Sequence, residues 1–294
     1  MSLSSNRKGI ILAGGMGTRL NPLTTAMSKQ LLPVYNKPMI YYPLSILMLA
    51  NIKDILIISQ TKFIPFYKDL LGDGSHLGIS IQYASQDKPR GIPDAFIIGE
   101  DFIKKDKIAL ILGDNIFYGS SFSGQLLEAI NSKNSSIFCS NVNNRSDFGI
   151  LEFDKNNNLN KIIEKPTNSL SSLAVTGLYF YNNDVLEIVK NLKPSSRGEL
   201  EISDINNHYI NNKIINVIRL YRGTLWLDTG SFENLFQCSA IIHSIEKNTN
   251  VMVGCIEEIA FHKKWITSKN LETIINNGKN TEYFKNLKRI IDFE

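Results

Sequence analysis

Short runs of aliphatic and β-branched residues alternate with longer amphipathic segments along the first half of the chain. Buried parallel strands are continuous apolar runs bounded by Gly, Asn or Asp, so we expect these runs to form a parallel sheet with helices between its strands. Pro38 and Pro93 suit the first turn of a helix. The predicted strands are residues 8–13, 54–60, 80–85 and 107–115, and the predicted helices are residues 38–50, 64–71, 93–102 and 121–131.

The pattern changes at about residue 135. Strand-like runs joined by short polar turns predict antiparallel additions to the sheet, and the segment from Ser231 onward predicts helices. No internal repeat or linker is visible, so we predict one domain over residues 1–294, with a core of about 7–240 and a helical elaboration of about 241–294. The later strands are predicted within residues 135–143, 148–166, with a loop tip at 156–158, and 174–183, and the later helices at 231–248, 270–277 and 281–293.

This alternation predicts the α/β class, with a mixed, mainly parallel sheet flanked by helices. In such folds the connections place helices on both faces of the sheet, and ligands bind beyond the carboxyl ends of the strands. Candidate functional residues should therefore follow directly after strands.

Composition narrows the class further. The chain of 294 residues is 43% hydrophobic and 20% charged, which is ordinary for a globular protein. Its net charge of +4 includes no long basic block, so a nucleic-acid partner is not expected. The apolar run 39–50 is shorter than the ~20 residues of a membrane-spanning helix, and the N-terminus lacks a signal-peptide core. We expect a cytoplasmic protein without membrane association, whose cysteines are unpaired thiols: Cys139, Cys238 and Cys255.

The segment LAGGMGTRL, residues 12–20, follows the first predicted strand and could hold phosphate. It is neither a P-loop, since Thr18 and Arg19 stand where Lys and Ser/Thr would, nor a G-x-G-x-x-G fingerprint. Arg19 offers a fixed charged fork for phosphate oxygens, although a tight turn with a surface arginine is the alternative. Three glycines leave the backbone amides accessible to phosphate: Gly14, Gly15 and Gly17.

Further charged residues stand where a phosphate site would need them. Lys29 follows Arg19 without an intervening strand and could face the same phosphates, although most lone lysines are surface residues. Asp114 and Asp228 each end an apolar run, and paired carboxylates suit Mg²⁺, whereas either aspartate alone is more simply a turn or cap residue. Glu164 leaves a predicted strand and could line a pocket rim rather than plain surface.

No nucleophile elbow or Cys/His pairing occurs, so nothing visible requires covalent catalysis. Glycines, Arg, Lys and two Asp can position and neutralise phosphates, which is most of what phosphoryl-type transfer demands of a protein.

Together these motifs resemble the sugar-phosphate nucleotidyltransferase family, from about residue 7 to about residue 266. GGMGTRL and SKQLLP are typical of the whole family, whereas NKPMIYYPLS, RGELEISDIN and WLDTG are similar to its thymidylyltransferase branch. The resemblance implies a Rossmann-like core and a homotetramer. It also implies the reaction of dTTP with α-D-glucose 1-phosphate, assisted by Mg²⁺, to give dTDP-glucose and pyrophosphate by direct attack on the α-phosphorus.

The resemblance also implies roles for individual residues. Arg19 and Lys29 would be catalytic and hold the leaving phosphates, while Asp114 and Asp228 would bind the metal. Nucleotide-binding residues would be Leu12, Gly14, Gly15, Gly17, Thr18, Gln86 and Gly91. Sugar-phosphate-binding residues would be Asn115, Gly149, Glu164, Lys165 and Val175. A second nucleotide site for feedback inhibition would include Tyr118, Gly119 and Arg222.

Some positions depart from the family pattern. Ile92, Pro93 and Asp94 stand where Leu-Ala-Gln is usual, and Phe148 replaces a usual tyrosine. The reaction type does not depend on these positions, but the choice of base and sugar can. UTP or another hexose 1-phosphate is therefore an alternative substrate, and a non-catalytic nucleotide-sensing subunit is an alternative of another class.

Overall fold

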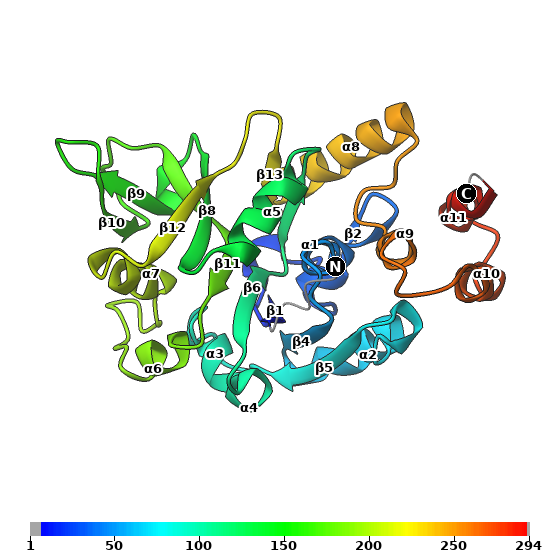
Figure 1. Cartoon of the computed structure of the whole chain (residues 1–294), viewed down its shortest axis with the longest axis horizontal. Coiled ribbons are helices and arrows are strands. Elements are labelled where there is room, and N and C mark those ends of the chain that lie inside the picture. Colours follow the sequence, from blue (N-terminus) through cyan, green and yellow to red (C-terminus); the bar gives the residue numbers. More distant parts are fainter. Residues whose placement is uncertain (1–6, 293–294) are drawn as a thin grey trace.

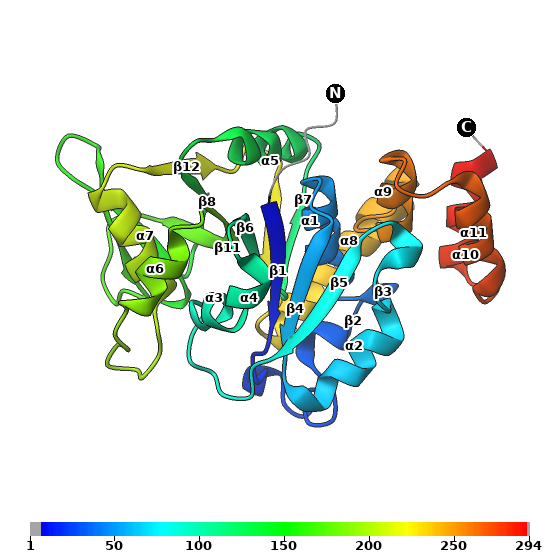
Figure 2. The ribbon, with the colours of Figure 1, turned by 60° about the horizontal axis from the view of Figure 1, so that its bottom comes forward.

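A parallel sheet forms the centre of the molecule in the computed structural model, which describes residues 7–292. Strand β1 (Arg7–Ala13) pairs in parallel with β4 (Asp54–Ser59) on one side and with β6 (Lys107–Leu112) on the other. Strand β5 (Ser80–Ser85) extends the sheet beyond β4 (Figure 2). The strand order reverses between β1 and β6, and such switch points place ligands at the carboxyl ends of the two strands.

The second part of the sheet is largely antiparallel, as predicted (Figure 1). Strand β11 (Leu173–Tyr181) pairs antiparallel with β6 and carries the sheet on to β8, β9 and β10. Strand β12 (Ile215–Arg219), which the sequence pattern did not predict, joins β8 in parallel. Within the described residues the sheet has nine strands. The remaining bounds are β8 (Ser135–Asn141), β9 (Gly149–Phe153) and β10 (Leu159–Glu164).

Helices cover both faces of the parallel strands, because alternate side chains of each strand point to opposite faces. Ile11 of β1 packs in a cluster with residues of α1, α2, α5 and α9, whereas Ile10 packs in a second cluster with residues of α3, α6 and α7. The bounds are α1 (Tyr41–Leu49), α2 (Ile64–Leu71), α3 (Asp94–Ile98), α4 (Glu100–Ile103), α5 (Phe122–Asn131), α6 (Val185–Lys190), α7 (Ile202–Asn211) and α9 (Ile256–His262).

Two predicted helices differ from the structure. Pro38 does not begin a helix but ends β3 (Lys37–Pro38), which pairs with β2 (Pro33–Val34) in a small hairpin ahead of α1. The helix predicted from Pro93 is two helices, α3 and α4, separated at Gly99, where a Cβ would approach Ile10 Cδ1 to 3.0 Å. Close packing against the sheet therefore interrupts a segment whose apolar pattern is continuous.

The position of Asp228 also differs from the prediction. Its strand, β13 (Leu225–Asp228), is not part of the parallel sheet but pairs antiparallel with β7 (Asn115–Tyr118) in a separate ribbon. The register places Asp228 opposite Asn115, directly after Asp114. The two aspartates thus come together across this ribbon rather than along one sheet edge.

The C-terminal part is helical, and its last helices lie at one end of the molecule (Figure 1). No helix among residues 7–292 has both the length and the apolar character needed to cross a bilayer. All three cysteines are free and buried, as predicted. Residues 1–6, which belong to the segment that was predicted to lack a signal-peptide core, lie outside the described residues. The helices are α8 (Phe232–Thr249), α10 (Ser268–Asn277) and α11 (Glu282–Asp292).

A buried ion pair fastens α8 to the β2–β3 hairpin. Lys37 Nζ lies 2.7 Å from Glu246 Oε1, and both side chains are almost inaccessible. Glu246 also accepts hydrogen bonds from Asn36 Nδ2 and from the backbone amide of Val253, each at 2.8 Å. Each charge is therefore stable in the interior only while the other is present.

We predict that E246Q lowers the free energy of unfolding by about 3 kcal/mol, because it leaves the buried Lys37 ammonium without a counter-charge. Urea unfolding of the purified variant measures this change. The matched control is E100Q, which removes the partner of Lys190 in an exposed pair and should cost at most about 1 kcal/mol. Equal losses in the two variants would contradict this account of the α8 attachment.

Candidate functional site

The glycine loop leaves β1 at the switch point of the sheet. Gly17 has φ of +62°, in the left-handed region, and precedes a 3₁₀ turn over Thr18–Leu20. Thr24 Oγ1 donates a hydrogen bond to the Gly17 carbonyl at 2.9 Å. This hydrogen bond closes the loop onto the following segment. Arg19 and Asp228 both approach Gly230, since a Cβ on this glycine would lie 3.0 Å from an Arg19 nitrogen and 2.7 Å from Asp228 Oδ1. Arg19 is therefore directed toward Asp228.

Lys29 and Asp114 form an ion pair of 2.5 Å in the floor of the site. Burial by itself raises the pKa of Asp114, but the charge of Lys29, with hydrogen bonds from Lys29 and Asn115, outweighs it and leaves the pKa below its usual value. Lys29 is therefore a buried residue of the site and not the surface lysine that its isolated position in the sequence would equally fit.

Asp228 lies next to this pair and, within residues 7–292, forms no ion pair of its own. Burial, followed by the negative charge of Asp114, raises its pKa to about 6, while Lys29 and Arg19 oppose the shift. Asp228 Oδ1 is buried and lies close to the Gly230 backbone, but it accepts no hydrogen bond of good geometry among the described residues. A buried acceptor left unpaired is costly unless a ligand completes it.

The aspartates provide a donor set that fits Mg²⁺. The ion takes oxygen ligands and is commonly held by one or two carboxylates, with water and substrate phosphates completing its octahedron. Asp114 and the orphaned Oδ1 of Asp228 supply such oxygens, and the phosphate loop lies beside them. Within residues 7–292 no group of three or more His, Cys, Asp or Glu side chains is placed so that it could hold a metal ion.

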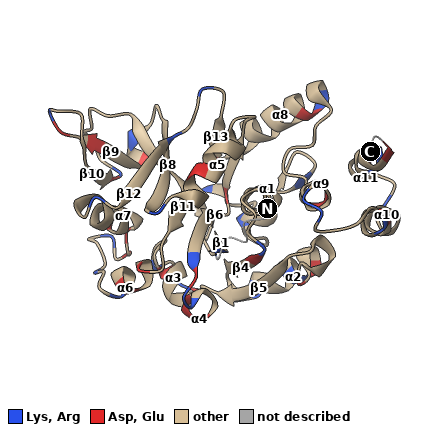
Figure 3. Ribbon diagram, viewed as in Figure 1, with Lys and Arg blue, Asp and Glu red and all other residues tan. Residues whose placement is uncertain are grey.

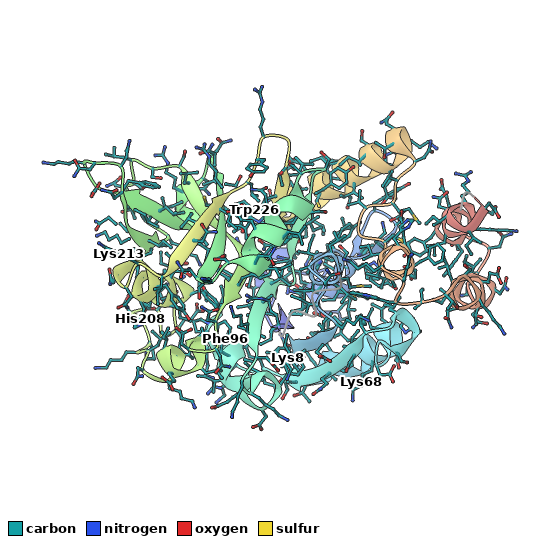
Figure 4. All side chains as sticks on the ribbon, viewed as in Figure 1. Lys8, Lys68, Phe96, His208, Lys213 and Trp226 are labelled. Atoms are coloured by element: carbon teal, nitrogen blue, oxygen red, sulfur yellow. The ribbon has the colours of Figure 1, made fainter. Side chains whose placement is uncertain are left out.

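Asn115 fixes the position of Asp114. Its Oδ1 accepts hydrogen bonds from Trp226 Nε1 at 2.6 Å and from the Gly177 amide at 3.0 Å, and its Nδ2 donates to Asp114 Oδ1 at 3.0 Å. A Cβ on Gly177 would come within 2.5 Å of this oxygen, so only glycine allows the contact. Trp226, labelled in Figure 4, was not singled out from the sequence, although it precedes Asp228 closely.

Two cavities meet at Arg19 and Asp114, which line both. The first, of about 340 Å³, is bounded by the glycine loop and Lys29. The second, of about 200 Å³, has a mixed polar and aromatic lining that includes all five predicted sugar-side residues. Those five residues are Asn115, Gly149, Glu164, Lys165 and Val175.

A charged cluster closes the second cavity on the side of α7. Arg197 bonds Glu201 through two nitrogens, at 2.6 and 3.1 Å, and lies 3.8 Å from Glu164. Burial, followed by the charge of Glu201, raises the pKa of Glu164 above its usual value. Arg197 and Glu201 lie in the segment RGELEISDIN, but no role was predicted for either residue, because their proximity to Glu164 comes from folding and not from spacing.

Of the predicted nucleotide-binding residues, Gly15, Gly17 and Thr18 line the first cavity, whereas Leu12, Gly14, Gln86 and Gly91 do not. Gly14 lies against Gln86, since a Cβ on it would be 2.6 Å from Gln86 Oε1. Leu12 belongs to β1, and its carbonyl accepts the Gly113 amide at 2.9 Å. Gly91 has φ of +101° and bridges to Leu200, whose backbone would collide with any Cβ there. These residues border the glycine loop but line neither of the two cavities.

The predicted second site is only partly assembled. Tyr118 and Gly119 line a separate cavity of about 310 Å³ between α1 and α9. Arg222 does not line it; this residue is exposed in the turn between β12 and β13, although Thr224 of that turn packs on Gly119. The three residues therefore share a region but not one cavity.

The chain matches the profile of the nucleotidyl transferase family over residues 8–245. The chain therefore belongs to the nucleotidyl transferase family, and its glycine loop and two aspartates lie at the switch point of the sheet. The solved structure of a UDP-glucose pyrophosphorylase bound to UDP-glucose has the same fold, with a TM-score of 0.71 over 81% of this chain and 98% of its own, at 23% identity.

Other relatives define the group within that family. A glucose-1-phosphate thymidylyltransferase of Neisseria meningitidis is 49% identical over 97% of this chain and 99% of its own, and one of Mycolicibacterium smegmatis is 45% identical over 98% and 100%. A Bacillus anthracis structure described as the same enzyme, with sucrose, has a TM-score of 0.74 at 38% identity, covering 80% of this chain and 94% of its own. The chain belongs to the glucose-1-phosphate thymidylyltransferase family.

We predict that G17A lowers the free energy of unfolding by about 1–2 kcal/mol, because alanine at φ of +62° is strained and its Cβ would lie 2.9 Å from Thr24 Cγ2. The control is G15A in the same loop, where a Cβ meets no atom within 4 Å. Thermal or urea unfolding compares the two. Loss of stability in G15A equal to that in G17A would contradict the predicted loop geometry.

Proposed function

We propose that the chain transfers the thymidylyl group of dTTP to α-D-glucose 1-phosphate and releases pyrophosphate, with Mg²⁺ held by Asp114 and Asp228. The observation that carries the proposal is the junction of a phosphate-loop cavity and a sugar-sized polar cavity at Arg19 and Asp114. The names of the relatives supply the substrates. The resemblance supplies the metal, and the orphaned carboxylate oxygen of Asp228 supports it.

In this reaction an oxygen of the sugar phosphate attacks the α-phosphorus of dTTP. The bond from that phosphorus to the oxygen of the β-phosphate breaks, and pyrophosphate leaves with the electron pair. The glycine loop binds the β- and γ-phosphates through backbone amides, and Arg19 and Lys29 stabilise the charge that develops on the leaving group. The bound metal supplies further charge neutralisation. Glu164 accepts hydrogen bonds from hydroxyl groups of the sugar, and Lys165 binds the sugar phosphate.

No step requires a protein nucleophile. Holding both phosphates at the junction makes the attack effectively unimolecular, which provides much of the acceleration in such reactions. Lys29 and Asn115 both bond Asp114 and hold its carboxylate in place. The junction of the two cavities is therefore fixed before substrates bind.

We propose further that the cavity beside Tyr118 and Gly119 receives a second nucleotide for feedback control. Its lining combines aromatic and aliphatic groups, which suit a base, with the polar side chains of Lys263, His262 and Glu258. The homotetramer implied by the resemblance stays a prediction.

The first experiment measures pyrophosphate release with glucose 1-phosphate, Mg²⁺ and dTTP, UTP, ATP or GTP in turn. We expect preference for dTTP and loss of release with a chelator. Preference for UTP or for another hexose 1-phosphate would change the assigned substrates but leave the proposed mechanism unchanged. Absence of release with every pair would leave the non-catalytic nucleotide-sensing subunit as the explanation.

R19A and K29A should each lower kcat by about 100-fold, because each removes a cation that stabilises developing phosphate charge. Steady-state pyrophosphate release measures the effect, and circular dichroism verifies folding. K68A removes an exposed lysine of α2 outside the site and serves as the control. Near-native turnover in both folded variants would exclude Arg19 and Lys29 from these roles.

D228N should raise the Mg²⁺ concentration needed for half-maximal activity by about tenfold or more, which corresponds to about 1.4 kcal/mol of binding free energy. The reason is that an amide replaces one of two anionic metal ligands. A Mg²⁺ titration of activity provides the measurement, with D69N on exposed α2 as a charge-matched control. An unchanged midpoint would remove Asp228 from the metal site.

A further inference from the structure

Gln86 and Asp94 form a buried hydrogen-bonded pair beside the glycine loop. Gln86 Nε2 donates to Asp94 Oδ2 at 2.8 Å, and the two residues are 6% and 1% exposed. Asp94 falls within the segment that departs from the family pattern, where glutamine is usual. This pair is therefore a feature of this chain and not one that the resemblance implies.

The chemistry of the pair fixes the orientation of the Gln86 amide. A carboxylate can only accept hydrogen bonds, whereas the amide has a donating nitrogen and an accepting oxygen at its two ends. The nitrogen must therefore face Asp94, and Oε1 must face the other way. The opposite orientation would set an amide oxygen against a carboxylate oxygen in a buried place, where an unpaired acceptor is expensive.

The free end of the amide points at the loop. Gln86 Oε1 lies so close to Gly14 that a Cβ there would be 2.6 Å away, and within the described part of the chain no donor reaches this oxygen. This oxygen is therefore available to accept a hydrogen bond from a nucleotide bound at the glycine loop.

Asp94 is itself held firmly. It opens α3 directly after Pro93, and Arg90 places a guanidinium nitrogen 2.9 Å from Asp94 Oδ1 without forming a hydrogen bond of good geometry. The next residues of α3 are fully buried, and Phe96, labelled in Figure 4, packs edge-on against Tyr181. The carboxylate thus has a fixed position relative to the sheet.

We propose that Asp94 is a positioning residue that sets base specificity by holding Gln86 with its oxygen toward the nucleotide base; this inference rests on the proposed function. A fixed acceptor favours a base that carries a donor at the matching place, such as the N3–H of thymine. Cytosine has an acceptor at N3, and its amino donor lies one ring position away. Glutamine or asparagine at position 94 can donate as well as accept, so neither fixes Gln86.

The test compares kcat/KM for dTTP, dCTP and dUTP in the wild-type protein, D94N, D94Q and D94E. We expect the dTTP/dCTP ratio to fall by about tenfold or more in D94N and D94Q, which corresponds to about 1.4 kcal/mol. D94E keeps an acceptor-only group and should retain more of the wild-type ratio. The dTTP/dUTP ratio should stay unchanged in every variant, because uracil presents the same edge and lacks only the methyl group.

Controls separate this inference from the proposed function. D101N removes an exposed charge from α4 and should leave both ratios at wild-type values. A wild-type protein without activity on any of the three nucleotides would overturn the proposed function. An active wild type preferring dTTP, with the same dTTP/dCTP ratio in folded D94N or D94Q, would overturn the role of Asp94 alone. Equal changes in both ratios would show a merely structural role and also overturn it.

Discussion

The close approach of two half-buried carboxylates governs the site. Asp114 is neutralised by Lys29, but Asp228 shares the same pocket with an oxygen left unpaired and a pKa raised to about 6 by burial and by Asp114. The register of the β7–β13 ribbon holds the two residues in this arrangement. A pocket with concentrated negative charge and an unpaired carboxylate oxygen suits the cation that the proposed function requires.

The β7–β13 ribbon imposes this approach. Its register sets Asp228 opposite Asn115, and Trp226 of the same strand binds Asn115, which in turn orients Asp114. The parallel sheet supplies only one of the two aspartates, at the end of β6. The other end of the ribbon, at Tyr118, borders the separate cavity beside α9. A four-residue strand therefore reaches from the acidic pair to a second concave surface.

The sequence predicted what depends on local pattern. The runs that became β1, β4, β5 and β6, and the helix over 64–71, agree with the structure because periodicity and flanking residues determine them. The sequence pattern could not predict pairings between distant segments. These are the β7–β13 ribbon that ends at Asp228, the parallel pairing of β12 with β8, and the contact of Arg197 with Glu164. The distribution of charge did not indicate these pairings, since lysines, arginines and acidic residues are dispersed over the whole described structure (Figure 3). The glycine loop was recognised because its constraint lies within a few residues.

Reaction type and substrate choice are held by different parts of the molecule. The charged groups at the junction belong to the loop after β1, to the end of β6 and to the ribbon, and none departs from the family pattern. The departures lie away from this junction: Asp94 bonds Gln86, through which we propose that it affects base choice, and the ring centroids of Phe148 and Trp226 lie 5.1 Å apart beside the second cavity. Since neither touches the Lys29–Asp114 pair, each can change selectivity while the charge arrangement stays the same. Selectivity in this fold is therefore free to vary around a fixed phosphate chemistry.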